Sequence, residues 1–154
     1  MRKVKSNSVF RAAMATDISV AVTVKVRFSE LDPLGVVWHG NYVKYLEDAR
    51  EEFGRKWGLE YMTIFSAGYY APVFDMKMRF MQPARVDDVL EVECSYRPAV
   101  GAKLCFDYTV RRKCDSAIIL TASSIQLFTS VSGEFEPSEP EFFSRWKNSL
   151  PQGE

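Results

Sequence analysis

The chain has 154 residues, of which 47% are hydrophobic, and its 20 basic side chains balance 20 acidic ones. This length and apolar content predict one globular domain with a substantial core. Zero net charge provides no long-range attraction for nucleic acid, which argues against a DNA- or RNA-binding role, and it favours self-association. No run of about 18 apolar residues occurs, so no membrane-spanning helix is predicted.

The three cysteines are odd in number and lack the CxxC spacing of zinc sites, so neither a disulfide framework nor a structural metal is expected. They are Cys94, Cys105 and Cys114. Reduced cysteines are typical of the cytoplasm, which is the expected location. Residues 1–17 lack the apolar segment of a signal peptide, and they are predicted to form a flexible tail ahead of a single domain over residues 18–150.

Alternating apolar and polar side chains over residues 20–28 predict a first strand with one buried face. After a loop, an apolar stripe predicts a long helix over residues 41–57, with Asn41 as its N-cap and Gly58 as its C-terminal stop. The stripe consists of Tyr42, Tyr45, Leu46, Ala49, Phe53 and Trp57. Such large side chains favour a helix that is wrapped by a sheet.

Four more strands are predicted in succession after an irregular segment or short helical turn at residues 59–68. They are expected near residues 74–80, 90–96, 104–110 and 118–128. The last of them lacks clean alternation, which predicts burial on both of its faces. Short turns join these strands, so their pairing is predicted to be antiparallel, and Pro140 opens a final short helix. This order indicates an α+β fold with one five-stranded sheet around one helix.

The loop before the long helix carries the residue types of a site for carbonyl chemistry. Asp32 and Pro33 leave the first strand, and Gly35 and Gly40 give the backbone freedom to turn back. The Asp32 carboxylate is thereby placed a few residues ahead of a helix N-terminus, whose unpaired N–H groups can stabilise an oxyanion. The alternative interpretation, an Asp that only forms a turn before Pro, also fits this residue taken alone.

Residues 32–42 read DPLGVVWHGNY. They resemble the signature of hotdog-fold acyl-CoA thioesterases of the 4-hydroxybenzoyl-CoA thioesterase type, in which an Asp leaves the first strand and a His or Tyr shortly precedes Asn-Tyr on the central helix. A second block similar to that family, FMQPARVDDVL, covers residues 80–90. The likeness extends over about residues 20–131. It implies a hotdog fold, and it implies hydrolysis of a small aromatic or short-chain aliphatic acyl-CoA to free acid and coenzyme A without a cofactor.

The resemblance assigns catalysis to two residues. Asp32 would supply the carboxylate that attacks the thioester carbonyl or activates a water on it, and both roles stay open. At His39 the useful group would be the backbone N–H, with the imidazole as an optional helper. One histidine cannot build a metal site, so no metal is expected. The start of the helix is expected to bind substrate through Gly40, Asn41 and Tyr42.

Three further residues are candidates for substrate binding. Tyr70 precedes the strand at residues 74–80, where it would line an acyl pocket or pack in the core. Arg97 and Lys103 flank a turn, where they would bind coenzyme A phosphates or form a solvated face. Glu47 lies one step off the apolar stripe. It is a reserve candidate, because a carboxylate on this helix is catalytic in one branch of the hotdog thioesterases.

An open sheet edge favours self-association, and the resemblance implies homodimers or homotetramers with active sites between subunits. Two other functions stay open. One is a non-catalytic protein that binds acyl thioesters, against which the presence of Asp32 argues. The other is an acyl-thioester hydratase or dehydratase, whose usual proline beside the histidine is missing at His39. Neither nucleic acid nor a membrane is expected as a partner.

Overall fold

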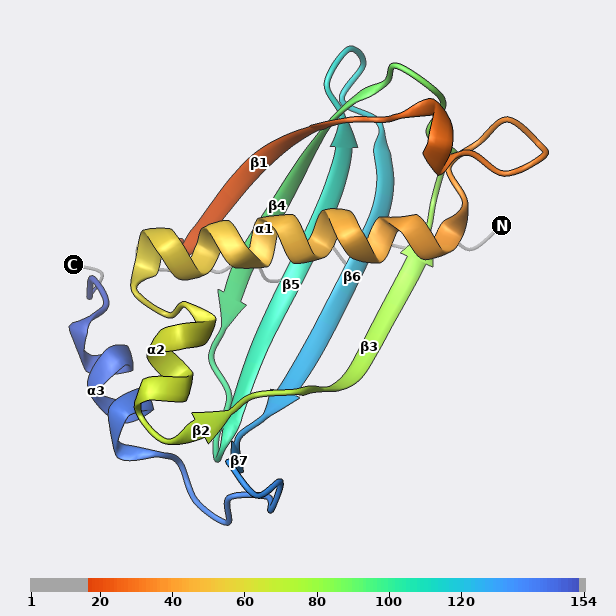
Figure 1. Cartoon of the computed structure of the whole chain (residues 1–154). Coiled ribbons are helices and arrows are strands. Elements are labelled where there is room, and N and C mark those ends of the chain that lie inside the picture. The colour runs from red at the N-terminus through yellow and green to blue at the C-terminus, as the bar shows by residue number, and fades with distance from the viewer. Residues whose placement is uncertain (1–16, 153–154) are drawn as a thin grey trace, which may run out of the picture.

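The sheet consists of five antiparallel strands, which confirms the predicted α+β architecture (Figure 1). The computed structural model describes residues 17–152, so residues 1–16 of the predicted tail lie outside the described part. In spatial order the strands are β1 (Ser19–Lys25), β4 (Val89–Arg97), β5 (Lys103–Arg112), β6 (Ile118–Leu127) and β3 (Val73–Phe80). Short connections join β4 to β5 and β5 to β6, as sequential antiparallel strands allow.

The long helix α1 (Tyr42–Trp57) lies across one face of this sheet (Figure 1). The face that it buries is the predicted apolar stripe: Tyr45, Leu46, Ala49 and Phe53 are at most 2% exposed. Phe53 meets Phe106 of β5 edge to face, with 4.9 Å between the ring centroids. Gly58 adopts a φ of 73° at the end of the helix, which confirms the predicted stop, because this left-handed conformation favours glycine.

The first strand is shorter than the residues 20–28 that its alternation predicts. β1 ends at Lys25, and the chain enters a 3-10 turn, η1 (Phe28–Glu30). The cause is local, because the Glu30 carboxylate accepts a hydrogen bond from the N–H of Arg27 at 2.8 Å and so turns the chain out of the sheet. Phe28 is therefore 81% exposed instead of continuing the buried face.

Strand β6 is buried on one face and half-buried on the other, so the prediction of burial on both faces is wrong for its outer face. Leu120, Ser124 and Gln126 point into the core and are at most 4% exposed. Thr121 and Ser123, on the opposite face, are half-buried. The polar residues on this strand are thus distributed over both faces, which hides the alternation in the sequence.

Shorter elements close the end of the core where α1 finishes. They are α2 (Tyr61–Ser66), the pair β2 (Tyr69–Tyr70) and β7 (Thr129–Ser130), and α3 (Glu141–Ser149). The predicted final helix docks as expected: Phe143 is buried, and Trp146 donates its indole N–H to the carbonyl oxygen of Trp57 at 2.7 Å. α3 therefore pins the last turn of α1.

β3 forms one edge of the sheet, and its outer side has no partner strand among residues 17–152. Large apolar side chains lie exposed on and beside this edge, namely Val73, Phe74, Phe80 and Met81. Among the described helices, none is long and apolar enough to cross a membrane.

Candidate active site

The Asp32 loop is a narrow turn held by backbone hydrogen bonds. Leu31 and Val37 form an isolated antiparallel bridge. Between them, the N–H of Asp32 donates to the carbonyl of Val36 at 2.8 Å, and the N–H of Gly35 donates to the carbonyl of Asp32 at 2.9 Å. Gly35 has a φ of +75°, a conformation that other residues rarely adopt. The loop projects beyond the N-terminal end of α1 (Figure 1).

One oxygen of the Asp32 carboxylate stabilises the turn through a hydrogen bond. Oδ1 accepts a hydrogen bond from the N–H of Leu34 at 2.8 Å, which is the turn-forming role expected of an Asp before Pro. No described residue donates a hydrogen bond to Oδ2. The side chain is half-buried. This arrangement holds the backbone of the loop while leaving one carboxylate oxygen for a reacting group.

Asn41 does not cap α1 through its side chain, so the predicted capping mechanism is wrong. α1 is preceded by a 3-10 turn, η2 (His39–Asn41), and Asn41 is itself helical, with no side-chain bond to the first turn. Its amide instead donates to the carbonyl of Glu30 at 2.8 Å, an acceptor that it shares with the N–H of Trp38 at 2.9 Å. Asn41 therefore fastens the start of the helix to the chain segment that carries Asp32.

The first N–H groups of this helical segment point at no acceptor. Trp38 and Asn41 donate their backbone N–H groups to carbonyls, whereas none of the described residues accepts from the N–H of His39 or Gly40. Helix N-termini leave such donors free, and free donors can bind an oxyanion. A larger residue at Gly40 would clash with its neighbour, because a Cβ there would lie 2.3 Å from the Trp38 ring.

The side chains of His39 and Tyr42, which are also predicted to belong to the site, contact other residues of the fold. The His39 ring is exposed and lies among aromatics, with its centroid 5.1 Å from that of Trp38 and 6.3 Å from that of Phe80. Tyr42 is only 3% exposed, and its hydroxyl accepts a hydrogen bond from the N–H of Ala84 at 3.3 Å. Burial raises the pKa of the Tyr42 hydroxyl. The substrate-binding role of Tyr42 stays a prediction.

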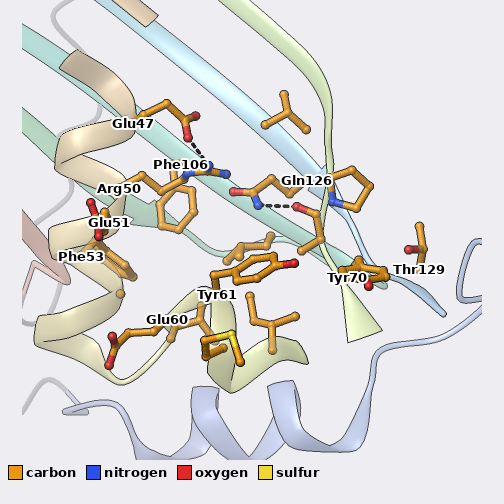
Figure 2. A pocket seen from close by; sticks show the side chains of 18 of the residues that line it. Glu47, Arg50, Glu51, Phe53, Glu60, Tyr61, Tyr70, Phe106, Gln126 and Thr129 are labelled. Carbon is orange, nitrogen blue, oxygen red and sulfur yellow. Dashed lines mark hydrogen bonds and ion pairs between the residues drawn. The ribbon is translucent and has the colours of Figure 1, made fainter. Parts of the chain in front are cut away.

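A cavity of about 990 Å³ lies near the other end of α1. Its walls come from α1, α2, β2, β3, β5, β6 and the segment around β7, and Figure 2 shows their side chains. Apolar lining residues include Phe53, Leu59, Ile64, Pro72, Leu104 and Phe106. Of the predicted site residues, Tyr70 and the reserve candidate Glu47 line this cavity, whereas Asp32 and His39 do not.

Charged side chains gather on the α1 side of the cavity. Glu47 and Arg50 form an ion pair there, with 44% and 27% of their side chains exposed. Asp48, Glu51 and Glu60 also line the cavity, so carboxylates outnumber cations at it. Arg50 and Gln126 line the cavity although the sequence does not predict them as site residues. For Gln126 a signal existed, since a glutamine interrupts the apolar residues of a buried strand.

Neither of the predicted phosphate-binding cations lines the cavity, and neither lies at the Asp32 loop. Arg97 pairs with Asp107 across β4 and β5, with 3.2 Å between Nε and Oδ1. Lys103 is exposed at the start of β5. The turn between them lies at the opposite end of the sheet from the Asp32 loop (Figure 1). Within a single chain, Arg97 and Lys103 therefore lie far from the Asp32 carboxylate, and their role in binding coenzyme A stays a prediction. Residues 17–152 contain no cluster of three or more His, Cys, Asp or Glu side chains that could hold a metal ion.

A family model described as the thioesterase superfamily matches residues 34–119, more than half of the chain. An acyl-CoA thioester hydrolase, YbgC, of Escherichia coli O157:H7 is 31% identical over 83 residues, which are 54% of this chain and 62% of that enzyme. The 4-hydroxybenzoyl-CoA thioesterase of Pseudomonas sp. strain CBS-3 is 26% identical over 122 residues, which are 75% of this chain and 86% of that enzyme.

Solved structures share the fold. A hypothetical protein from Thermus thermophilus has 32% identity and a TM-score of 0.73, with 84% of this chain and 98% of that chain covered. The structure of the Pseudomonas enzyme has a TM-score of 0.74 at 24% identity, with 84% and 97% covered. These neighbours have the hotdog fold that the resemblance implies.

Proposed function

This chain belongs to the thioesterase superfamily and is a thioester hydrolase, and we propose that it hydrolyses small acyl-CoA thioesters with Asp32 as the reacting carboxylate. The observation that carries the proposal is the free Oδ2 of Asp32 in a loop fastened to a helix N-terminus with two unpaired N–H groups. In this proposal the N–H groups of His39 and Gly40 hold the oxyanion. One such donor typically contributes about 3–4 kcal/mol to transition-state stabilisation.

The chemistry requires one carboxylate and one water. The carboxylate attacks the thioester carbonyl, or it removes a proton from a water that does so, and the carbonyl oxygen becomes an oxyanion. Collapse of that intermediate breaks the carbon–sulfur bond, and the thiolate of coenzyme A leaves. In the first route the acyl group is left on Asp32 as a mixed anhydride, which water hydrolyses to release the acid and regenerate the carboxylate; in the second route the attacking water becomes part of the acid directly. Both roles of Asp32 fit the same geometry, and no cofactor enters the reaction.

Within a single chain, the two parts of the proposed site, the Asp32 loop and the cavity, lie toward different ends of the edge strand β3. The Asp32 loop and the helix start lie near Phe80, whose ring centroid is 5.9 Å from that of Tyr42. The cavity includes Val73 at the other end of β3. Eight residues of strand span about 24 Å, and Asp32 is not among the residues that line the cavity of its own chain.

A homodimer would bring the two parts together. If β3 pairs with β3 of a second copy about a two-fold axis, the Phe80 end of one strand lies beside the Val73 end of the other. The Asp32 loop of each chain then faces the cavity of its partner. The unpaired edge and its exposed apolar side chains, Phe74 among them, support this pairing. A homotetramer of two such dimers stays open, as does the cytoplasmic location.

Two alternatives make different demands. A binding protein for acyl thioesters would need the cavity but no free carboxylate oxygen. A hydratase would need a histidine working with a helix carboxylate, but Glu47 on α1 is paired with Arg50, and His39 contacts the rings of Trp38 and Phe80. Incubation with a panel of acyl-CoAs and a thiol-reactive dye separates the three, because only hydrolysis releases free thiol. No thiol from any acyl-CoA would refute the proposal.

Mixing two inactive variants tests the shared site. Asp32→Asn removes the carboxylate, and Ala71→Trp fills the cavity. In a heterodimer of the two, one of the two sites has both an intact Asp32 and an intact cavity. Subunit exchange in an equal mixture should therefore restore about a quarter of the wild-type thiol release. If each site is built within one chain, the mixture stays inactive. Sedimentation velocity checks that both variants remain dimers.

A further inference from the structure

Glu30 takes no part in the proposed reaction, yet both its main chain and its side chain bond to neighbouring segments. Its carbonyl oxygen accepts from the N–H of Trp38 at 2.9 Å and from the side-chain amide of Asn41 at 2.8 Å. Its carboxylate accepts from the N–H of Arg27 at 2.8 Å. The residue therefore joins the turn η1, which follows β1, to the helical segment that begins with η2.

The two bonds to the Glu30 carbonyl come from either side of the proposed oxyanion site. Trp38 directly precedes the two residues whose N–H groups are free, and Asn41 directly follows them. Both flanking residues donate to the same oxygen atom. Because Asp32 follows Glu30 by only two residues, the position of this oxygen sets where the free donors lie relative to the reacting carboxylate.

The Glu30 side chain restrains the backbone that carries this oxygen. The N–H of Glu30 donates to the carbonyl of Arg27 at 3.0 Å, while the Glu30 carboxylate accepts from the N–H of Arg27. This reciprocal pair limits the rotation of the backbone at Glu30. On its other side, the carboxylate lies near Tyr45 of α1. Burial, and after it the Glu30 carboxylate, raise the pKa of the Tyr45 hydroxyl.

We propose that Glu30 is a positioning residue for thioester hydrolysis, whose side chain holds the Asp32 loop and the free N–H donors in register. In this role it touches neither the substrate nor the reacting atoms. The inference rests on the proposed function, because it takes Asp32 to react and those donors to hold the oxyanion. Such a restraint matters for rate, since a displacement of about 1 Å can cost about a hundredfold.

Two other roles for Glu30 make different demands. A side chain that only stabilises the fold would lower the thermal midpoint when it is replaced, but it would leave kcat of the folded protein unchanged. A carboxylate that itself attacks or transfers a proton would lose its activity as the amide, because an amide does neither. A positioning residue needs only an acceptor for the N–H of Arg27.

Two substitutions of similar length separate these roles. Glu30→Met cannot accept from the N–H of Arg27, so kcat for the best acyl-CoA of the panel should fall about tenfold, while KM changes by less than about twofold. Glu30→Gln retains an oxygen that accepts this bond, and it should keep kcat within about threefold of the unmodified protein. Thiol release gives both constants, and thermal unfolding shows whether each variant is folded.

Asp115 offers a matched control, because it stabilises another turn through the same kind of bond. Its Oδ1 accepts from the N–H of Ala117 at 3.1 Å, in the connection between β5 and β6. Asp115→Leu removes this bond, so the thermal midpoint should fall. The kcat of this control should stay within about twofold, because the turn carries none of the proposed reacting groups.

Asn41→Ala tests the same link from the helix side, because it removes the amide that donates to the Glu30 carbonyl. We expect kcat to fall about tenfold with little change in KM. The double variant Asn41→Ala, Glu30→Met should lose less than the product of the two single losses, since both act on the position of one oxygen. This variant also carries the test if Glu30→Met does not fold.

The outcomes separate the two proposals. Unchanged kcat in folded Glu30→Met, or in Asn41→Ala, would overturn the positioning role and leave the thioesterase in place. A loss in Glu30→Gln as large as that in Glu30→Met would also overturn it, because the amide keeps the acceptor. If the unmodified protein releases no thiol from any acyl-CoA, or if Asp32→Asn is fully active, the proposed function fails instead.

Discussion

The Asp32 loop and the cavity, which meet opposite ends of α1, are built in different ways. The loop and helix start are one continuous segment, residues 30–42, held by bonds between near neighbours such as Leu34 to Asp32 and Asn41 to Glu30. The cavity draws its walls from segments as distant in sequence as Glu47 and Phe135. In the proposed mechanism the reacting groups therefore come from one short segment, whereas the cavity proposed to select the acyl group is built from the whole fold. Substitutions in the two regions should therefore affect different kinetic parameters.

Removing the carboxylate of the loop should produce the largest effect. Asp32→Asn is expected to lower kcat by at least about a thousandfold, because it removes the reacting group, whereas the thermal midpoint stays nearly unchanged. Because an amide oxygen can still accept from the N–H of Leu34, the turn survives. Thiol release and thermal unfolding measure the two quantities. An active Asn variant would show that Asp32 is not the reacting group. The loop and the cavity would then no longer differ in the way proposed, with chemistry in the loop and acyl binding in the cavity.

A smaller effect is expected from adding one methyl group at the helix start. Gly40→Ala must displace the Trp38 ring, and with it the N–H groups proposed to hold the oxyanion. We expect kcat to fall about tenfold, because catalysis is sensitive to misplacement of this kind. Removing the obstructing ring in the double variant Trp38→Ala, Gly40→Ala should recover part of the loss relative to Trp38→Ala alone. Purely additive losses would show that the ring contact is not the cause.

A cavity substitution should change which substrates are used and leave the chemistry intact. Tyr70→Ala enlarges the cavity, so we expect KM for small acyl-CoAs to rise about fivefold while kcat stays within about twofold. Bulkier acyl-CoAs should lose less. Tyr61→Ala, which removes a more exposed ring from the same wall, is a control with a smaller expected change. A large loss of kcat for every substrate would place Tyr70 among the catalytic groups instead.

The smallest effect is expected at the histidine. His39→Ala retains the backbone N–H, so kcat should change by no more than about threefold if this group alone serves the oxyanion. The ring is exposed and lies beside the rings of Trp38 and Phe80, so little stability should be lost. A hundredfold fall in kcat with an unchanged thermal midpoint would assign a role to the imidazole.

The sequence predicts most of the segment that carries Asp32 but little of the cavity. The turn at Gly35, the helix and its stop at Gly58 depend on local conformation, and the structure confirms them. The predicted capping role of Asn41 is wrong because its side-chain amide donates instead to the carbonyl of Glu30, eleven residues away. Alternation alone includes Phe28 in the first strand, because it does not reveal the competing hydrogen bond from the N–H of Arg27 to the Glu30 side chain.

Most of the residues that line the cavity cannot be predicted from the sequence, because they come together only in the folded chain. Gln126 and Ala71 become neighbours only after β6 pairs with β3, and no spacing in the chain encodes that meeting. Arg50 reads as half of an ordinary i,i+3 ion pair on a helix surface. Only the fold turns that surface toward a cavity, so the spacing in the chain does not identify the pair as part of the cavity wall.

The docking of α3 has a consequence for how this chain could acquire new substrates. α3 lies beyond the matched residues 34–119, yet its Trp146 ring lies 6.4 Å from that of Phe53, which lines the cavity. Changes in this C-terminal appendage can therefore be transmitted to the acyl-binding wall through a single phenylalanine. Such indirect tuning would let the range of accepted acyl groups drift during evolution, or be redirected by engineering, without altering a residue that reacts.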